Sequence, residues 1–249
     1  MPNSIALIIP ALNEESVLLK VLDDIYSSTF GFFDQVELIL INDGSVDSTG
    51  QIMNKFAEMH PNTRVIHNPK NRGLGASFQI GLKYASSEYV MLLCGDGGLP
   101  AQSLPTIFSE VGNADLIIPY MVNLKKIKSK QRYFLSRTYV FLLNVISGFN
   151  LHYYNGLPIY RRAFFEEMTV KSSGFGFQGE ILVKLLKSGC TFKEVGVEGA
   201  EETGKSDALR IRNILSVART FARLSIELIS FKPISTRAIE RARQIKSLN

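Results

Sequence analysis

The first part of the chain alternates short apolar runs with segments whose apolar residues recur every three or four positions. The runs predict buried strands at Ile5–Pro10, Val36–Ile41, Arg64–His67 and Tyr89–Leu93. The helical spacing predicts helices at Glu15–Tyr26, from Thr49 to about Met59, and from the glycine-spaced segment 71–81 to about Ala85. Because strands and helices alternate, we predict an α/β fold with a mostly parallel central sheet and helices on both faces.

The later part of the chain has another pattern. A basic stretch from Lys125 to Arg137 leads into the apolar run Tyr139–Ile146, which predicts a helix ending at Gly148. Further helices are predicted from about Gln178 to Lys187 and, as an amphipathic segment, from Leu209 to Phe231. We therefore predict one domain, residues 1–231, with halves 1–120 and 121–231, and a basic tail, residues 232–249, that we expect to be frayed.

Charge divides the chain at the same place. The total of 28 Lys+Arg and 23 Asp+Glu gives a net charge of +5. Residues 1–120 hold 6 basic and 13 acidic side chains, whereas residues 121–249 hold 22 and 10. Only two cysteines are present, which excludes a disulfide framework and favours a reducing, cytoplasmic location. No apolar run approaches the roughly 20 residues of a membrane span, so we expect a soluble or peripheral protein.

Polar and glycine-rich segments follow the four predicted strands. They are Pro10–Glu14, Asn42–Ser45, His67–Gly75 and Cys94–Pro100. In parallel sheets the carboxyl ends of the strands meet at one edge, and ligands bind there. We therefore expect these four segments to form one site.

Four motifs in these segments carry a family resemblance. They are IIPALNE at 8–14, LINDGS at 40–45 with Asp47, NRGLG at 71–75 with Gly81, and Gly95–Asp96 with Pro100. Together they resemble the nucleotide-sugar half of the inverting family 2 glycosyltransferases, of the GT-A type. The segments from Arg132 to Arg162, 174–180 and 203–206 are similar to the dolichyl-phosphate mannose synthase branch. The resemblance implies a Rossmann-like sheet plus C-terminal amphipathic helices.

The resemblance also implies a donor site for a nucleoside diphosphate sugar. Asp43 would accept the imide N–H of uracil or guanine, and Gly73 and Gly75 would let the backbone approach the nucleoside. The other implied contacts are Pro10, Ala11, Asn13, Glu14, Asn71, Gln178 and Lys205. The alternative is that Asp43–Gly44 is a plain turn and the glycines belong to a plain loop.

Asp96 matches the last carboxylate of the family's D-x-D motif. The resemblance implies that it binds Mg2+ or Mn2+ against the donor diphosphate, where the ion neutralises charge on the leaving group. Cys94 replaces the first carboxylate of the motif, so we expect weaker metal binding. The alternative for Asp96 is a structural or ribose-contacting role.

Glu180 matches an acidic residue that the family places beside the sugar and acceptor. A hydroxyl acceptor would require it as a general base with a raised pKa. A lipid phosphate is already anionic and requires none, and Glu180 and Gln178 would then position sugar hydroxyls or the metal. The alternative is a solvated carboxylate at a helix start. Glu201 and Asp207 replace two expected cations of the diphosphate clamp, and Lys205, Arg210 and Arg212 lie near enough in sequence to substitute for them. The alternatives are a different donor, another loop geometry or lost activity.

The basic and apolar stretch of the second half favours a membrane surface. Acceptor or membrane contacts are predicted for Lys125, Lys126, Arg132, Arg137, Arg161 and Arg162. The alternatives are a core helix with a solvated basic start and, for the last two, ordinary surface arginines. The sequence has no nucleic-acid-binding motif, so we predict no nucleic-acid partner.

These features support a hypothesis of hexose transfer. The donor would be a GDP- or UDP-sugar, and the acceptor a polyprenyl phosphate or other lipid-linked molecule at the cytosolic membrane face. Two alternatives stay open. One is transfer to a hydroxyl with Glu180 as base, in surface polysaccharide synthesis; the other is a nucleotide-binding relative with impaired catalysis. The pattern leaves the sugar, the nucleobase and the oligomeric state undetermined.

Overall fold

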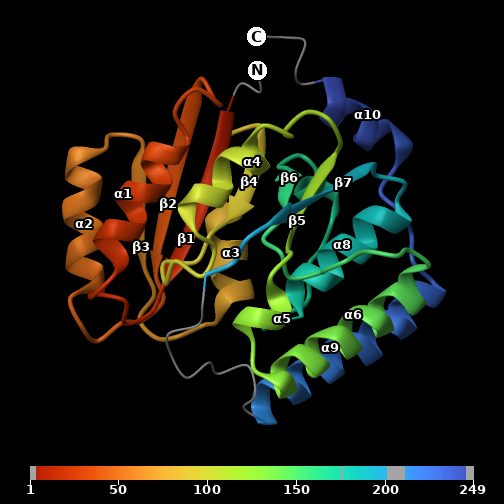
Figure 1. Cartoon of the computed structure of the whole chain (residues 1–249). Helices are drawn as coiled ribbons and strands as arrows, with labels where there is room; N and C mark the ends of the chain where they lie inside the picture. The colour runs from red at the N-terminus through yellow and green to blue at the C-terminus, as the bar shows by residue number, and fades with distance from the viewer. Residues whose placement is uncertain (1–3, 175, 201–210, 245–249) are drawn as a thin grey trace.

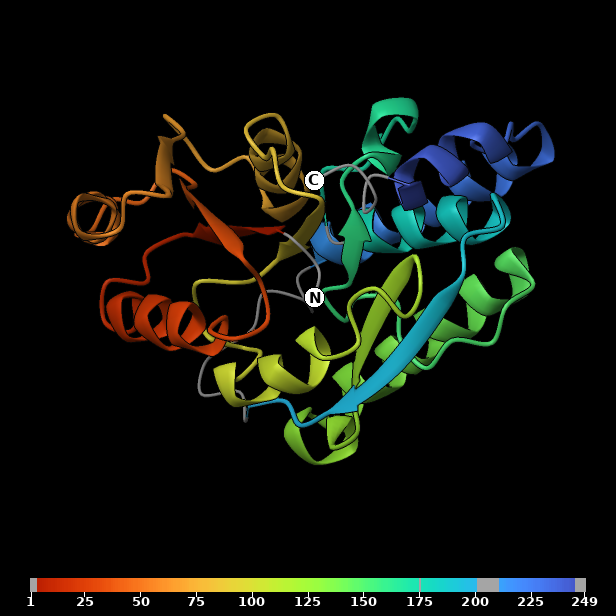
Figure 2. The ribbon, with the colours of Figure 1, turned by 90° about the horizontal axis from the view of Figure 1, so that it is seen from above.

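A central twisted sheet with helices on both faces organises the protein (Figures 1 and 2). The computed structural model describes residues 4–174, 176–200 and 211–244. Within these ranges the strands are β1 (Ser4–Ala11), β2 (Gln35–Asn42), β3 (Thr63–His67), β4 (Tyr89–Leu92), β5 (Leu116–Met121), β6 (Ile159–Arg161) and β7 (Phe192–Val197). All seven belong to one sheet, in the order β3-β2-β1-β4-β6-β5-β7.

The helices connect and cover these strands. In the described residues they are α1 (Leu18–Ser28), α2 (Thr49–Met59), α3 (Leu74–Leu82), the 3-10 turn η1 (Ala101–Ser103), α4 (Leu104–Phe108), α5 (Leu124–Ile127), α6 (Lys130–Ser147), α7 (Phe164–Glu167), α8 (Phe177–Lys187), α9 (Ile211–Ile229) and α10 (Thr236–Gln244). The predicted α/β fold with a mostly parallel sheet is confirmed, and each predicted strand and helix has a counterpart.

Strand direction fixes where the loops meet. β1 pairs in parallel with β2 and β4, β2 with β3, and β5 with β7, so the carboxyl ends of these strands share one edge. β6 is antiparallel to both β4 and β5 and runs the opposite way. Its last residue, Arg161, pairs with Tyr89 at the start of β4. The end of β6 therefore lies at the amino edge.

Alternating strand residues build a core on each face of the sheet. On one face Ile5, Leu7 and Ile9 pack with α1, α2 and α4. On the other, Ala6 and Ile8 pack with α3, α8 and inward residues of α6 and α9. The near-continuous apolar strands follow from this burial on both faces.

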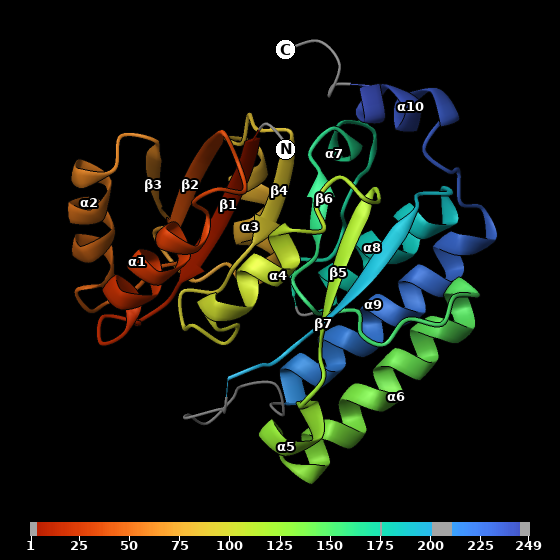
Figure 3. The same ribbon diagram turned by 45° about the horizontal axis from the view of Figure 1, so that its top comes forward.

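Helices α6 and α9 form an outer layer over α8. Both contact α8 and run next to each other in two views (Figures 1 and 3). Residues 177–186 of α8 are all buried, since the sheet covers one side of this helix and the outer layer the other. In the part of the chain that the structure describes, no helix is long and apolar enough to cross a bilayer.

The expectation of a frayed tail is wrong for residues 236–244, which form α10. Ile239 and Ala242 are buried against the core, and the Arg243 guanidinium binds Asp115 through Nε at 2.9 Å and Nη2 at 2.6 Å. The tail sequence is polar and basic, but this spacing of two apolar residues and one arginine gives the helix an inward side.

Candidate functional site

Loops from neighbouring strands meet at the carboxyl edge, as predicted. The Asp43 N–H donates to the Ala11 carbonyl at 3.0 Å, and the Gly95 N–H donates to the Pro10 carbonyl at 3.0 Å. The ends of β1, β2 and β4 are thus joined directly by backbone bonds. Pro10 and Ala11 are buried there, so they form the floor of this edge.

The loop after β1 is held by the loop after β2. Asn13 has a left-handed backbone (φ 57°); its N–H donates to Ser45 Oγ at 3.0 Å, and its Oδ1 accepts the Val46 N–H at 2.9 Å. The Glu14 N–H donates to Thr49 Oγ1 at 2.8 Å. These bonds fix the backbone of both residues and leave the Glu14 carboxylate partly exposed.

Asp43 holds the loop that follows β3. It is buried, and its Oδ1 accepts Asn68 Nδ2 at 2.8 Å and the Arg72 N–H at 3.0 Å, while Oδ2 accepts the Gly73 N–H at 2.9 Å. The plain-turn alternative is therefore incomplete, because Asp43 also holds the loop after β3. Its contact with a nucleobase stays a prediction, and Asn68, which the sequence did not single out, is its partner.

The two glycines after β3 have different reasons to be glycine. Gly73 has a left-handed backbone with φ +88°, and Asn71 is exposed beside it. At Gly75 a Cβ would lie 2.8 Å from the Ser173 carbonyl carbon and oxygen, and the Gly75 N–H donates to that oxygen at 3.1 Å. A side chain at Gly75 is therefore excluded by the chain itself, and the approach of either glycine to a nucleoside stays a prediction.

Glu14 interacts electrostatically with two other carboxylates, Asp96 and Asp47. Burial raises the pKa of Glu14, and the Asp96 and Asp47 carboxylates raise it further. Asp96 is exposed, and its Oδ1 accepts the Gly98 N–H at 2.9 Å. Burial also raises the pKa of the Cys94 thiol, with Asp96 and Glu14 adding to the shift. The thiol therefore stays protonated at neutral pH, whereas the form of cysteine that binds metals is the thiolate.

This donor set suits a cation that arrives with a phosphate ligand. Mg2+ and Mn2+ need only one or two protein carboxylates when phosphate oxygens complete the shell. Asp96 supplies an exposed carboxylate, and Glu14 lies close enough to interact with it electrostatically. In the described ranges no three or more His, Cys, Asp or Glu residues are grouped to hold an ion by themselves.

Glu180 is buried and fully paired, with 1% of its surface exposed. Its carboxylate accepts the Lys171 and Ser172 N–H groups at 2.9 Å each, and binds Lys184 Nζ and Arg223 Nη2 at 2.8 Å each. Burial alone raises its pKa, but the bonds from Lys171, Lys184 and Ser172 outweigh burial, and the net shift is downward. The expected raised pKa is therefore wrong, as is the alternative of a solvated carboxylate. Gln178, on the same helix, is also buried.

Arg161 does not contact an acceptor or a membrane in this fold. It is 5% exposed, donates to Glu88 Oε1 at 2.7 Å and to the Ala242 carbonyl at 3.2 Å, and lies over the Tyr89 ring. Arg162 pairs with Glu166 at 2.9 Å. Both sit at the amino edge because β6 is antiparallel. Burial argues against the predicted contact for Arg161, whereas for the partly exposed Arg162 it stays a prediction.

The basic residues before and within α6 follow the carboxyl end of β5 along the chain. Lys125 and Lys126 are exposed on α5. Arg137 is exposed and donates to the His152 carbonyl at 3.3 Å, whereas Arg132 is half-buried and burial lowers its pKa. Lys205, Glu201, Asp207 and Arg210 lie outside the described residues.

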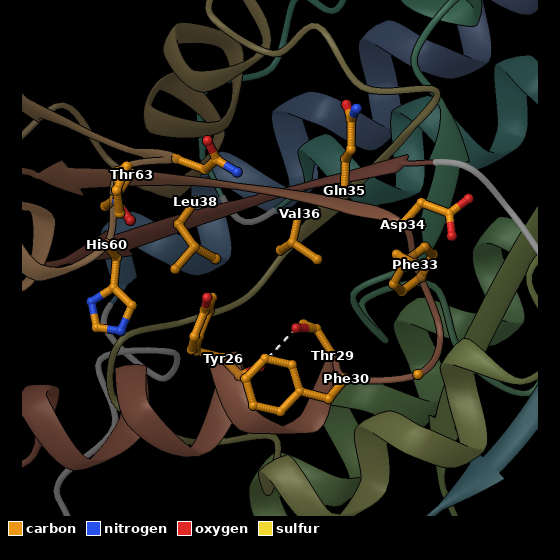
Figure 4. Close-up of a pocket in the computed structure, with 13 residues that line it drawn as sticks. Tyr26, Thr29, Phe30, Phe33, Asp34, Gln35, Val36, Leu38, His60 and Thr63 are labelled. Atoms are coloured by element: carbon orange, nitrogen blue, oxygen red, sulfur yellow. Dashed lines mark hydrogen bonds between the residues drawn. The ribbon is translucent and has the colours of Figure 1, made fainter. Parts of the chain in front are cut away.

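A pocket of about 280 Å3 opens at the opposite edge of the sheet (Figure 4). Its walls come from the end of α1, the starts of β2 and β3, and the loops that precede these strands, with Tyr26, Phe30, Asp34 and His60 among the lining residues. These strands end at the carboxyl edge, so this pocket is separate from the site formed by the strand-end loops.

Solved structures share this architecture. Glucosyl-3-phosphoglycerate synthase from Mycobacterium tuberculosis, solved with Mn2+, UDP-glucose and phosphoglyceric acid, aligns with a TM-score of 0.64 over 88% of this chain and 80% of that chain. At 17% identity this likeness concerns the fold alone. The fold is therefore of the GT-A type, an α/β sheet with a polar carboxyl edge.

The sequence profile of Glycosyl transferase family 2 matches residues 6–174, and the chain belongs to that family. The minor teichoic acid biosynthesis protein GgaA of Bacillus subtilis is 31% identical over 166 residues, 63% of this chain and 37% of that protein. A dolichyl-phosphate beta-glucosyltransferase, ALG5A of Trichomonas vaginalis, is 31% identical over 112 residues, 43% of this chain and 35% of that protein. The matched region thus spans little over a third of either relative.

Proposed function

We propose that this protein transfers a hexose from a nucleoside diphosphate sugar to a lipid-linked phosphate. The donor would bind at the carboxyl edge, with its base and ribose near Pro10–Glu14, Asp43 and the 71–75 loop. ALG5A is named for glucosyl transfer and the synthase structure holds UDP-glucose. These relatives favour UDP-glucose as the first donor to test, ahead of the mannosyl donor that the sequence resemblance suggested.

The burial and hydrogen bonds of Glu180 favour a phosphate acceptor over a hydroxyl acceptor. A hydroxyl acceptor must lose a proton to a base, but the carboxylate predicted for that task is buried, holds several donors and has a lowered pKa. A phosphate oxygen is already anionic and needs no base. The acceptor oxygen would attack the anomeric carbon from the side opposite the leaving diphosphate.

Asp96 is the residue we propose for metal and leaving-group binding, with Glu14 beside it. A divalent cation held there supplies electrostatic stabilisation of the departing diphosphate. Asp96 projects its carboxylate toward solvent and accepts one backbone hydrogen bond within the described residues, so it is available for this role. Lys205 stays a prediction for the diphosphate.

The activity test uses purified protein, Mn2+, and radiolabelled UDP-glucose or GDP-mannose with polyprenyl phosphate in detergent. We expect a labelled lipid product, and Asp96→Asn should lower turnover by about a hundredfold or more. Asp34→Asn, an exposed aspartate at the opposite edge, is the matched control. Transfer to a glycan hydroxyl in place of the lipid phosphate would contradict the acceptor. Absence of turnover with every donor, alongside intact nucleotide binding, would identify a relative with impaired catalysis.

We also propose that the outer layer of α6 and α9 contacts an anionic membrane at its cytosolic face. Phe134, Phe141 and Val145 of α6 are 73%, 64% and 63% exposed, and Ile226 and Ile229 of α9 are 69% and 85% exposed. At helical spacing these residues lie on the sides of the helices opposite their buried residues. We call these exposed apolar residues of the two neighbouring helices the outer face.

Charge favours a lipid surface as the occupant of the outer face. Residues 124–147 contain six Lys or Arg and no Asp or Glu. Lys125, Lys126, Lys130 and Arg137 are all exposed. Each basic residue near an anionic membrane contributes roughly 1 kcal/mol, and apolar side chains add burial at the acyl boundary.

Vesicle sedimentation tests this contact. The protein should bind vesicles that contain phosphatidylglycerol and bind weakly to phosphatidylcholine alone. Phe141→Asp should reduce binding, whereas Phe30→Asp should not, since Phe30 is equally exposed (64%) but lies at the pocket on the amino edge. Equal binding of both variants would contradict the proposal, and concentration-dependent dimers suppressed by Phe141→Asp would assign the face to a second copy.

A further inference from the structure

Residues 171–174, which we call the bridge segment, lie between helix α3 and helix α9. On the α3 side, the Ser173 carbonyl accepts the Gly75 N–H at 3.1 Å, and the Ser172 carbonyl accepts Gln79 Nε2 at 3.1 Å. A Cβ at Gly75 would approach the Ser173 backbone to 2.8 Å. The bridge segment therefore packs against the start of α3 without free space.

On its other side the bridge segment is held by α8 and α9. The Glu180 carboxylate accepts two of its backbone N–H groups, and Arg223 of α9 binds both Glu180, at 2.8 Å, and Ser172 Oγ. Ser172 Oγ also lies 3.2 Å from Thr220 Oγ1 of α9. A Cβ at Gly176, just beyond, would approach Thr220 to 2.8 Å, so this side is closely packed as well.

The contacts continue from the bridge segment to the strand-end loops. Gly75 belongs to the first turn of α3, and Gly73, just before it, donates its N–H to Asp43. A continuous path of hydrogen bonds and close packing thus runs from Arg223 through Glu180, the bridge segment and Gly75 toward the 71–73 loop. Both ends of the path belong to parts of the chain more than a hundred residues apart.

We propose that Arg223 is a positioning residue for the donor loop. It acts through Glu180 and Ser172 and touches neither donor nor acceptor. By holding the bridge segment against α3, it makes the geometry of residues 71–75 depend on how α9 lies on the molecule. The loop serves as a donor site only if the proposed function holds, but the mechanical link itself is independent of that function.

The charges around Glu180 allow the link to be weakened without unfolding the protein. Arg223 is 39% exposed at its side chain, whereas Lys184 is 3% exposed and contacts Glu180 at 2.8 Å. Without Arg223, Glu180 keeps Lys184 and the two backbone donors, so no unpaired buried charge is left. Arg223→Leu should therefore fold.

Hydrogen exchange in the free protein tests the link directly. In Arg223→Leu the peptides that cover residues 72–79 should exchange about tenfold faster than in wild type, and Arg223→Lys should restore much of the protection. Arg219→Leu, an exposed arginine one turn earlier on α9, is the control and should match wild type. Unchanged exchange in Arg223→Leu would overturn the proposal, whether or not the protein binds a nucleotide.

Calorimetry with UDP and Mn2+ then separates positioning from general stability. Arg223→Leu should raise the Kd for UDP about tenfold, roughly the loss expected for one charge-assisted hydrogen bond. Gln79→Ala removes the α3 contact of the same path, so the double variant should bind about as weakly as the weaker single variant. Additive losses would overturn the proposal. If wild type binds neither UDP nor GDP, the proposed function fails, while the exchange result still decides the link.

Discussion

The Asp43 carboxylate accepts hydrogen bonds from three donors of the loop that follows β3, and both of its oxygens take part. The sequence motif pointed to this residue through its resemblance to a nucleobase contact. The structure adds a structural role, because the same side chain holds the backbone at Arg72 and Gly73. The loop geometry therefore depends on this carboxylate, and its contact with a nucleobase stays a prediction.

Asp43→Asn should loosen this loop even without ligand. An asparagine has only one acceptor oxygen, so its NH2 group would face at least one of the three donors. We expect the free energy of unfolding to fall by about 1–3 kcal/mol. Urea unfolding measures this change, and Asp34→Asn is the exposed control. Equal stability of the two variants would show that the loop does not depend on Asp43.

At the scale of elements, the periodicity of apolar residues predicted those strands and helices that bury a clearly apolar side against the core. β1 to β4 and α1 to α3 follow the predicted ranges closely because each has a strongly patterned inward side. β5, β7 and the antiparallel direction of β6 were not predicted. β6 has three residues, and no local pattern in so short a strand encodes its direction, which is set by tertiary pairing with β4 and β5.

In the candidate site, too, the sequence predicted what local motifs determine and missed what tertiary packing determines. Strand-end motifs placed Asp43 and Asp96 at the carboxyl edge correctly. Two partners of Glu180, Ser172 and Arg223, could not be inferred, because they approach it only through tertiary packing of the bridge segment and α9. The predicted acceptor or membrane contact of Arg161 could not be checked from the sequence for a related reason, since the location of this residue follows from the direction of β6.

Helix α10 offers a test of element-level stability. Arg243 binds Asp115, which is 3% exposed at its side chain, while Arg243 itself is 42% exposed. Arg243→Met should lower the free energy of unfolding by about 1–3 kcal/mol, because a buried carboxylate loses a charged partner. Urea unfolding gives this difference, and Arg241→Met, an exposed arginine on the same helix, should show little change. A wild-type value for Arg243→Met would show that the Arg243–Asp115 pair does not stabilise the docking of α10.

In the whole molecule, the acidic first half and the basic second half are joined by ion pairs. Glu88 binds Arg161 at 2.7 Å, Asp115 binds Arg243 at 2.6 Å, and Glu110 binds Lys193 at 2.6 Å. Each pair takes its carboxylate from residues 1–120 and its cation from residues 121–249. The charge asymmetry of the sequence therefore contributes to internal contacts as well as to the outer face.

This arrangement predicts how stability depends on pH. Burial alone raises the pKa of Asp115, but the hydrogen bonds from Arg243 and Thr191 outweigh burial and hold it below 3.8, its unperturbed value. A lowered folded-state pKa stabilises the protein above the unfolded value, and this stabilisation is lost as the pH falls through the folded pKa. The stability gap between wild type and Arg243→Met should therefore be full at neutral pH and shrink below 3.8. Urea unfolding between pH 7 and pH 3 measures the gap; a gap that stays constant to pH 3 would show that the pair does not carry it.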